Sequence, residues 1–330
     1  MYNNKKILIT GGTGSFGHAF VERILKEYNP KKVVIFSRDE FKQHQMNEYF
    51  NDNRLRFFLG DVRDRERIEL AMDGIDFVIH AAALKQVPAA EYNPMEFIKT
   101  NVLGAENVVY AAIKFGVKKI VALSTDKASN PINLYGATKL LSDKIFVSAN
   151  NIIGKKNTRF SVVRYGNVFN SRGSVFPIFK KIVENKQKYF PITHPDMTRF
   201  IITLDEGIDF VIKSFERMHG GEIFIPKIKS LKILDLAKVM DDKKKIKYLG
   251  IRPGEKMHEF LFSSDETILI YDFKNHYVLA PSISFTHIAK NGYSKNKLGE
   301  KGKKLNKSFN YNSKSNLFLN RKEIEKLIKS

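Results

Sequence analysis

The stretch Lys6-Ile7-Leu8-Ile9-Thr10-Gly11-Gly12-Thr13-Gly14-Ser15-Phe16-Gly17 joins a short apolar run directly to a glycine-rich segment. Apolar residues then recur at helical spacing as far as Leu25. Three spaced glycines permit a tight turn, close approach of the backbone to a pyrophosphate, and close packing of a helix on a strand. Amide groups at the start of the helix can bind the phosphates. The stretch therefore predicts the first strand, turn and helix of a dinucleotide-binding domain.

Five further apolar runs alternate with helical patterns downstream of this unit. We expect strands at 32–36, 54–59, 77–80, 120–123 and 159–164. Six strands that alternate with helices predict an α/β fold with a Rossmann-type doubly wound parallel sheet. Beyond about residue 174, prolines punctuate shorter elements, which favours a smaller C-terminal substrate-binding region.

Composition excludes several classes of protein. The 330 residues include no cysteine, which removes disulfides, thiolate nucleophiles and cysteine-ligated zinc, and no metal site is predicted. The absence of cysteine also suits the reducing cytoplasm, which is the expected location. No apolar run approaches the roughly 20 residues of a membrane span, so no membrane partner is expected.

The net charge of +21 comes mainly from lysines, which are spread over the chain and densest from 290 to 329. A basic surface can bind nucleic acid, but the chain has no aromatic-interleaved RNA signature and no helix-turn-helix pattern. We favour a solvated lysine-rich surface over a polyanion site. An anionic sugar nucleotide would still benefit from the positive field.

A second informative stretch runs from Ser124 to Lys139 and follows the predicted strand 120–123. Tyr135 and Lys139 lie four residues apart, so a helix places both on one face. An ammonium beside a phenol favours the phenolate, so Tyr135 is expected to exchange a proton near neutral pH. Thr125 can donate to the same substrate oxygen, and Asp126-Lys127 adds an acid and a second base. A plain salt bridge is the alternative interpretation of Asp126-Lys127.

The end of the second strand bears on the choice of cofactor. Enzymes that use NAD tend to have an acid here to bind the ribose 2′-hydroxyl. This chain has Ser37 and Arg38, with Lys42 one turn later, and these suit a 2′-phosphate. The sequence therefore favours NADP over NAD, although Asp39 and Glu40 leave NAD open.

The domain prediction follows from these elements. An NADP-binding Rossmann domain is expected over 1–175, completed by 200–217, and a substrate-binding region over 176–199 and 218–330. Residues 290–315 are polar and lysine-rich and are expected to form a long loop. Asn320 followed by Glu323 predicts the start of a last helix.

Several single residues carry open alternatives. His80 is expected to be a hydrogen-bonded core residue, and Asn101 is expected to bond to backbone or water near the active site. Lys85 is either a substrate ligand or a plain surface lysine. Arg199 and Arg252 suit a diphosphate clamp, with surface salt bridges as the alternative.

These motifs together resemble the extended short-chain dehydrogenases/reductases that act on nucleotide sugars. Within that family, 124–128 leading to 135–139 resembles the UDP-N-acetylglucosamine 4,6-dehydratases that invert carbon 5, a group with members in pseudaminic acid biosynthesis. Supporting matches are 84–91, 164–168 and 250–256. The lysine-rich tail departs from the motif set.

The resemblance implies roles for particular residues. It places a cofactor site at Gly11, Thr13, Gly14, Ser15, Phe16, Gly17, Ser37, Arg38, Lys42, Asp61, Val62, Ala81, Leu123, Ser124, Tyr135, Lys139, Asn170 and Arg172. It places a UDP-sugar site at Lys85, Asn167, Thr193, Arg199, Arg252 and Glu255. It makes Lys127 the catalytic base, with Asp126, Tyr135, Lys139 and Thr125 beside it, and it implies a homo-oligomer.

The implied chemistry makes demands on two protonation states. Tyr135 takes the proton of the sugar 4-hydroxyl as carbon 4 is oxidised, and the ketone acidifies the hydrogen on carbon 5. Lys127 must then be a neutral amine, for which we expect a pKa lowered by burial near Lys139 and the nicotinamide. Asp126 must be a protonated carboxyl, so its pKa is expected to be raised.

Two other functions stay open. A nucleotide-sugar 4-epimerase would use the same fold, but it has no obvious need of Asp126-Lys127. A non-catalytic NADP-binding regulator or a nucleic-acid binder would have no need of four reactive side chains together, those of Tyr135, Lys139, Asp126 and Lys127. The sequence leaves open the hexose and nucleotide, the configuration at carbon 5, the subunit count and the role of the tail.

Overall fold

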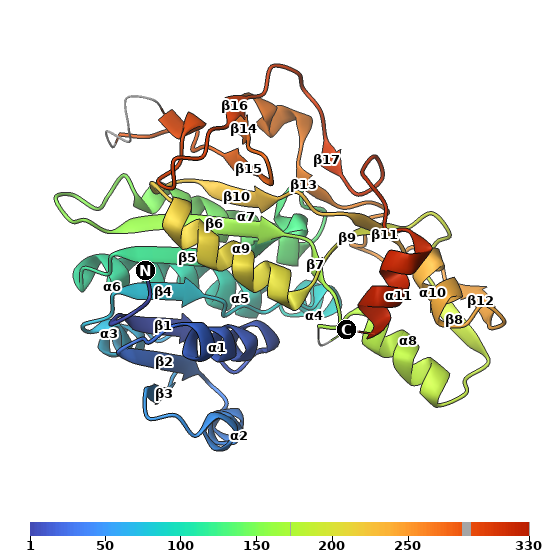
Figure 1. The fold of residues 1–330 in the computed structure, drawn as a ribbon, viewed down its shortest axis with the longest axis horizontal. Helices are drawn as coiled ribbons and strands as arrows, with labels where there is room; N and C mark the ends of the chain where they lie inside the picture. Colours follow the sequence, from blue (N-terminus) through green and yellow to red (C-terminus); the bar gives the residue numbers. More distant parts are fainter. Residues whose placement is uncertain (172, 286–291, 330) are drawn as a thin grey trace.

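A computed structural model describes residues 1–171, 173–285 and 292–329, and it is built around one large sheet with helices on both faces (Figure 1). Seven neighbouring strands of this sheet are parallel. In spatial order they are β10 (Ile223–Pro226), β6 (Arg159–Tyr165), β5 (Lys119–Thr125), β4 (Phe77–His80), β1 (Lys6–Thr10), β2 (Lys32–Ser37) and β3 (Leu55–Leu59). This topology confirms the Rossmann-type prediction.

The helices cover the sheet because successive strand residues point to opposite faces. Leu8 of β1 belongs to one buried cluster, while Ile7 and Ile9 belong to the other. The first cluster packs against α3 (Arg65–Met72), α6 (Gly104–Lys114) and α7 (Leu134–Ala149). The second packs against α1 (Ser15–Glu27), α2 (Glu40–Phe50) and α9 (Leu204–Arg217). The predicted helix 204–217 therefore does pack on the first domain.

The C-terminal half also extends the sheet, which the sequence did not predict. Three antiparallel strands follow β10 at the edge, namely β15 (His276–Leu279), β14 (Ile270–Asp272) and β16 (Lys303–Lys304). Segment 218–330 thus supplies four strands to the sheet of the dinucleotide-binding domain. The functional division of the chain into two regions stays a prediction.

A smaller group of elements lies beyond the carboxyl ends of the parallel strands (Figure 1). Its helices are α8 (Val175–Glu184), α10 (Ile233–Met240) and α11 (Arg321–Lys329), which pack around a separate apolar cluster. Its strands are β7 (Asn167–Val168), β8 (Tyr189–Ile192), β9 (Thr198–Ile202), β11 (Ser230–Lys232) and β12 (Lys245–Tyr248). Asn320 and Glu323 form the expected reciprocal cap of α11.

The predicted loop 290–315 is confirmed as mostly irregular over the part that the structure describes. It contains only η4 (Gly292–Ser294), β16 and β17 (Tyr311–Asn312). β17 pairs with β13 (Phe260–Phe262), which is followed by η3 (Ser264–Leu269). Among the described residues, no helix combines the length and the apolar character needed to cross a bilayer.

A π-helical turn, η1 (Ile98–Leu103), holds the loop that follows β4. The chain runs from α4 (Val87–Tyr92) through α5 (Pro94–Phe97) and η1 (Ile98–Leu103) into α6. Asn101 of η1 accepts a hydrogen bond from Leu84 N (2.8 Å) and donates to Leu84 O (2.9 Å) and Thr138 Oγ1 (3.0 Å). Asn101 therefore connects the loop that contains Lys85 to α7. Its bonds to the Leu84 backbone are the backbone bonds that the sequence predicted. His80 is also bonded as expected, to Thr10 Oγ1 (2.8 Å).

Gly136 lets α7 approach the turn after β5. That turn is η2 (Asp126–Ala128), a single 3₁₀ turn. A Cβ built on Gly136 would lie 2.3 Å from Lys127 O, which is backbone and has little freedom to move. A glycine is thus required where the Tyr135 helix meets the Asp126-Lys127 turn.

We predict that Gly136→Ala lowers stability by about 1–3 kcal/mol, because the methyl group overpacks this contact. Gly207→Ala is the matched control, since Gly207 is also helical and its Cβ would meet nothing within 4 Å. Thermal unfolding of both variants tests this. Equal melting temperatures would contradict the close approach.

Candidate active site

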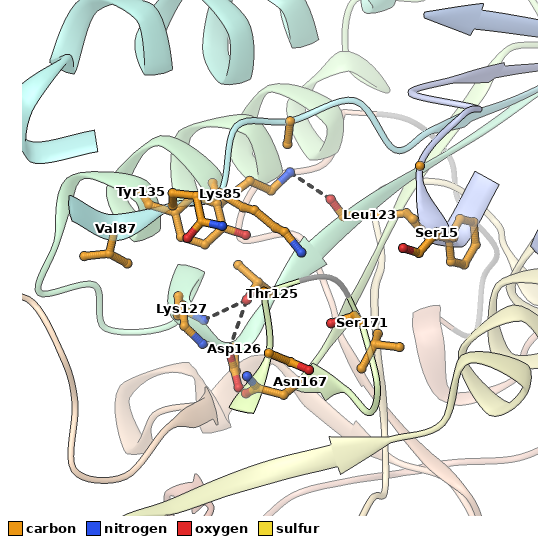
Figure 2. A pocket seen from close by; sticks show the side chains of 18 of the residues that line it. Ser15, Lys85, Val87, Leu123, Thr125, Asp126, Lys127, Tyr135, Asn167 and Ser171 are labelled. Carbon is orange, nitrogen blue, oxygen red and sulfur yellow. Dashed lines mark hydrogen bonds and ion pairs between the residues drawn. The ribbon is translucent and has the colours of Figure 1, made fainter. Parts of the chain in front are cut away.

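A cavity of about 1350 Å³ runs along the carboxyl edge of the parallel strands and reaches the smaller group of elements. It brings together the side chains predicted from distant parts of the chain. Figure 2 shows Tyr135, Lys127 and Asn167 around the same opening, each from a different element. Of the predicted site residues that the structure describes, all line the cavity except Asn170. Asn170 is exposed with a left-handed φ of 58°, and Arg172 lies outside the described residues.

The start of α1 fits a dinucleotide phosphate. No side chain caps the helix at Gly14, and its first turn carries no acidic residue. A Cβ on Gly17 would lie 2.3 Å from Gly12 O, so only glycine allows this close packing of helix on turn. The uncapped amide end lines the cavity, where an anion would be stabilised.

The predicted 2′-phosphate residues also line the cavity, at the end of β2. Arg38 is half exposed and lies 3.5 Å from the carboxylate of Asp61. Lys42 forms an ion pair with Asp39, whose carboxylate also caps α2 by accepting from Lys42 N. Asp39, one of the two acids that left NAD open, is therefore engaged at the start of α2. Ser37 is held by a hydrogen bond from Gln43 Nε2 (3.0 Å).

Asp61 is bound by arginine side chains. Its carboxylate accepts from Arg63 N (3.0 Å) and from Arg63 Nε (2.9 Å). Burial tends to raise the pKa of Asp61, but the hydrogen bonds from Arg63 and the charge of Arg38 lower it overall. The carboxylate stays ionised at the edge of the cavity, at a position predicted to belong to the cofactor site.

Tyr135 and Lys139 lie on one buried face of α7, as their spacing predicted. Lys139 Nζ donates to Leu123 O (2.8 Å) rather than to the phenol. Burial raises the pKa of Tyr135 to about 12, despite the opposing charge of Lys127 and a hydrogen bond with Thr125. The expected lowering of this pKa by Lys139 is therefore wrong for the protein alone. The phenol is protonated and is linked to Thr125.

The buried Asp126 forms an ion pair with Lys127, whose side chain is 22% exposed. Lys127 Nζ donates to Asp126 Oδ1 (3.0 Å), which also accepts from Thr125 Oγ1 (3.0 Å), and both bonds come from the turn after β5 (Figure 2). Asp126 is fully buried, and within the described parts of the chain its second oxygen has no hydrogen-bond partner. Burial raises the pKa of Asp126 although Lys127 opposes the shift, in the direction that the sequence predicted.

The predicted lowering of the Lys127 pKa is wrong. Burial does disfavour the ammonium, but the carboxylates of Asp126 and Glu259 outweigh it and raise the pKa of Lys127. Glu259 Oε1 lies 3.1 Å from Lys127 Nζ, on the side away from the turn. Glu259 could not be predicted to lie here from the sequence, because it is 132 positions further along the chain than Lys127.

The predicted substrate residues gather around one carboxylate. Glu255 accepts two hydrogen bonds of 3.0 Å from Arg252 and lies 3.4 Å from Arg199 and from Thr193 Oγ1. Burial tends to raise the pKa of Glu255, but Arg252 lowers it overall. Arg199 and Arg252 therefore form salt bridges, the alternative to a diphosphate clamp, and both line the cavity. Substrate binding by these residues stays a prediction.

Asn167 and Lys85 also line the cavity. The side-chain oxygen of Asn167 is buried and finds no hydrogen-bond partner among the residues that the structure describes, and such a group calls for a partner. Apolar residues of α8 that the sequence did not single out, Val175, Ile178 and Phe179, line the same space.

Comparisons with known proteins agree with this geometry. Residues 7–281 match the family model described as "Polysaccharide biosynthesis protein". The chain is 58% identical over 316 residues to a Campylobacter jejuni UDP-N-acetylglucosamine 4,6-dehydratase (inverting), covering 96% of this chain and 94% of that protein. It is 47% identical over 285 residues to a Rickettsia conorii UDP-glucose 4-epimerase, covering 84% and 83%.

A solved structure has the same fold. The chain resembles the X-ray structure of Pen from Bacillus thuringiensis, with a TM-score of 0.88, 35% identity and 99% coverage of both chains. Because the family model spans most of the chain and the relatives are this similar, the chain belongs to the polysaccharide biosynthesis protein family, within the extended short-chain dehydrogenases/reductases.

Proposed function

We propose that this protein is a UDP-N-acetylglucosamine 4,6-dehydratase that inverts carbon 5. The observation that carries the proposal is the buried Asp126–Lys127 pair beside Tyr135, open to a cavity at the edge of a dinucleotide-binding sheet. An acid, a base and a phenol in one place are what the removal of water from a sugar requires. The activity named for the Campylobacter jejuni relative supports it.

We also propose NADP as the cofactor. The uncapped start of α1 would hold the pyrophosphate, and Ser37, Arg38 and Lys42 would hold the 2′-phosphate. The engagement of Asp39 within α2 favours this choice over NAD. Bound there, the nicotinamide would supply a temporary oxidation at carbon 4 and return the same reducing equivalents at carbon 6.

Tyr135 receives the proton of the sugar 4-hydroxyl in this scheme. Its pKa of about 12 in the protein alone means that the phenolate must be stabilised when the site is filled. Thr125, which is bonded to the phenol, and the positive charge of Lys127 both act in that direction. The oxidised carbon 4 then acidifies the hydrogen on carbon 5.

The ion pair can supply both the neutral base and the protonated acid. Transfer of one proton over the 3.0 Å between Lys127 Nζ and Asp126 Oδ1 converts ammonium and carboxylate into amine and carboxylic acid. The raised pKa of Asp126 favours this form, whereas the raised pKa of Lys127 opposes it, so the neutral pair is the less populated form in the protein alone. Lys127 then takes the proton from carbon 5, and Asp126 gives its proton to the departing 6-hydroxyl. Loss of water regenerates the ion pair, and reprotonation of carbon 5 from the opposite face inverts it.

A second candidate is a nucleotide-sugar 4-epimerase, which the name of the Rickettsia conorii relative favours. Mass spectrometry of UDP-N-acetylglucosamine after incubation separates the two. A dehydratase gives a product lighter by one water, whereas a 4-epimer has unchanged mass. A product of unchanged mass would replace the dehydratase proposal.

Three further features are proposed from the family resemblance. The protein would act in the cytoplasm, assemble as a homo-oligomer and serve the biosynthesis of a pseudaminic acid-type sugar. These proposals do not affect the chemistry of the cavity.

We predict that Lys127→Ala lowers the rate of water loss by about 100-fold or more, because a positioned general base is removed. Binding of the dinucleotide, measured by calorimetry, should be preserved. Lys144→Ala, an exposed change on α7, is the control and should be fully active. Wild-type rates of water loss in Lys127→Ala would remove Lys127 from the reaction.

We predict that Arg38→Ala weakens binding of NADPH by about tenfold or more, since a charge-assisted hydrogen bond to phosphate is lost. Binding of NADH should change little, because it has no 2′-phosphate. Calorimetric titration with each dinucleotide tests this, with the exposed Arg56→Ala as control. An equal loss for both dinucleotides would exclude a 2′-phosphate role for Arg38.

A further inference from the structure

Glu259 is a buried carboxylate in the cavity wall that the scheme above leaves without a role. It precedes β13, and only 2% of it is exposed. One oxygen lies 3.1 Å from Lys127 Nζ. The other oxygen has no hydrogen-bond partner in the part of the chain that the structure describes, and Lys256 Nζ lies 4.0 Å from it. Such an unsatisfied buried oxygen is costly and calls for a reason.

The C-terminal segment holds Glu259 in place. Glu259 N donates to Ser313 Oγ (3.0 Å), and Ser313 N donates to Glu259 O (2.9 Å). Ser313 is fully buried and is also bonded to Thr198 Oγ1 (2.7 Å). The backbone of Glu259 is therefore fixed on both sides, so its side chain meets Lys127 in one defined position.

The charged groups around Glu259 come from several elements. Lys127 and Asp126 face it from η2, Arg199 from β9 with Nε at 3.9 Å, and Lys256 from its own segment. Tyr135 of α7 faces the same pair. Burial tends to raise the pKa of Glu259, but Lys127, Arg199 and Lys256 lower it overall, so it is ionised.

We propose that Glu259 is a positioning residue for the dehydration, which orients Lys127 and supplies the negative charge that keeps the Asp126–Lys127 pair proton-rich. This inference rests on the proposed function. The reactive form of the pair is an amine beside a carboxylic acid, which carries one proton. The fully deprotonated form, an amine beside a carboxylate, carries none. A neighbouring fixed negative charge favours that extra proton. It also stabilises the ammonium formed when Lys127 takes the proton from carbon 5.

The proposal has a distinctive consequence for pH dependence. The rate of water loss should follow a bell, because both an additional proton on the pair and a missing one stop the reaction. Glu259 moves both limbs of the pH profile to higher pH, since its charge favours the protonated form of Asp126 and of Lys127. Glu259→Gln keeps the shape and removes the charge, so both limbs should move to lower pH by about 1–2 units.

The experiment measures kcat and KM for water loss from UDP-N-acetylglucosamine across pH in the full-length protein. Glu259→Gln should lose about tenfold or more in kcat, with both limbs displaced and KM little changed. Glu259→Asp keeps the charge but draws the carboxylate back, so kcat should fall while the limbs stay. Glu222→Gln is the matched control, because Glu222 is also 2% exposed but accepts hydrogen bonds from Ser161 and Gly220 away from the cavity.

The outcomes separate clearly. Displaced limbs in Glu259→Gln, with unmoved limbs in the control Glu222→Gln, support the proposal. A lower rate with unmoved limbs in Glu259→Gln overturns it. Circular dichroism and thermal unfolding establish that each variant is folded. If Glu259→Gln does not fold, Glu259→Asp decides, and wild-type kcat in that variant overturns the proposal. Failure of the wild type to release water is a different result and removes the proposed function itself.

Discussion

The ammonium of Lys127, held between the carboxylates of Asp126 and Glu259, is the contact on which the rest of the site depends. Charges removed from water must be compensated, because an unpaired buried charge is strongly destabilising. The three groups come from the turn after β5 and from the segment before β13, which Ser313 fixes. The C-terminal half must therefore close over the sheet before the turn is satisfied. Folding and the assembly of the catalytic groups become one event.

A second buried network supports the cofactor side of the same turn. Arg164 of β6, which is 1% exposed, lies 3.3 Å from Asp143 and 3.4 Å from Glu266 and donates to Leu261 O (3.0 Å). Asp143 accepts from Ser124 Oγ (2.8 Å), one turn of α7 beyond Lys139. The network thus ties the end of β5 to α7 and to η3. Together with the close approach at Gly136, it sets where Tyr135 and Lys139 stand relative to Asp126-Lys127.

The sequence predicted the elements that depend on local pattern. The glycine turn at 11–17, the six strands and the pairing of Tyr135 with Lys139 on one helix face follow from spacing and alternation along the chain. The four strands that 218–330 adds to the sheet, and the position of Glu259, could not be predicted in this way, because strand pairing and ion pairing at long range depend on the folded path. The raised pKa of Asp126 was predicted correctly, but the predicted lowering of the pKa values of Lys127 and Tyr135 was wrong, because both depend on the folded surroundings. The pKa of Lys127 is set by a carboxylate distant in sequence, and that of Tyr135 is set by burial.

The central claim is that an acid and a base at the end of β5 remove water from a sugar oxidised at carbon 4. Proton NMR of UDP-N-acetylglucosamine turnover in heavy water tests it most directly. The account predicts a product with a methyl group at carbon 6, deuterium at carbon 5 and inverted configuration there. A product that keeps its 6-hydroxyl and its original hydrogen at carbon 5 would contradict it.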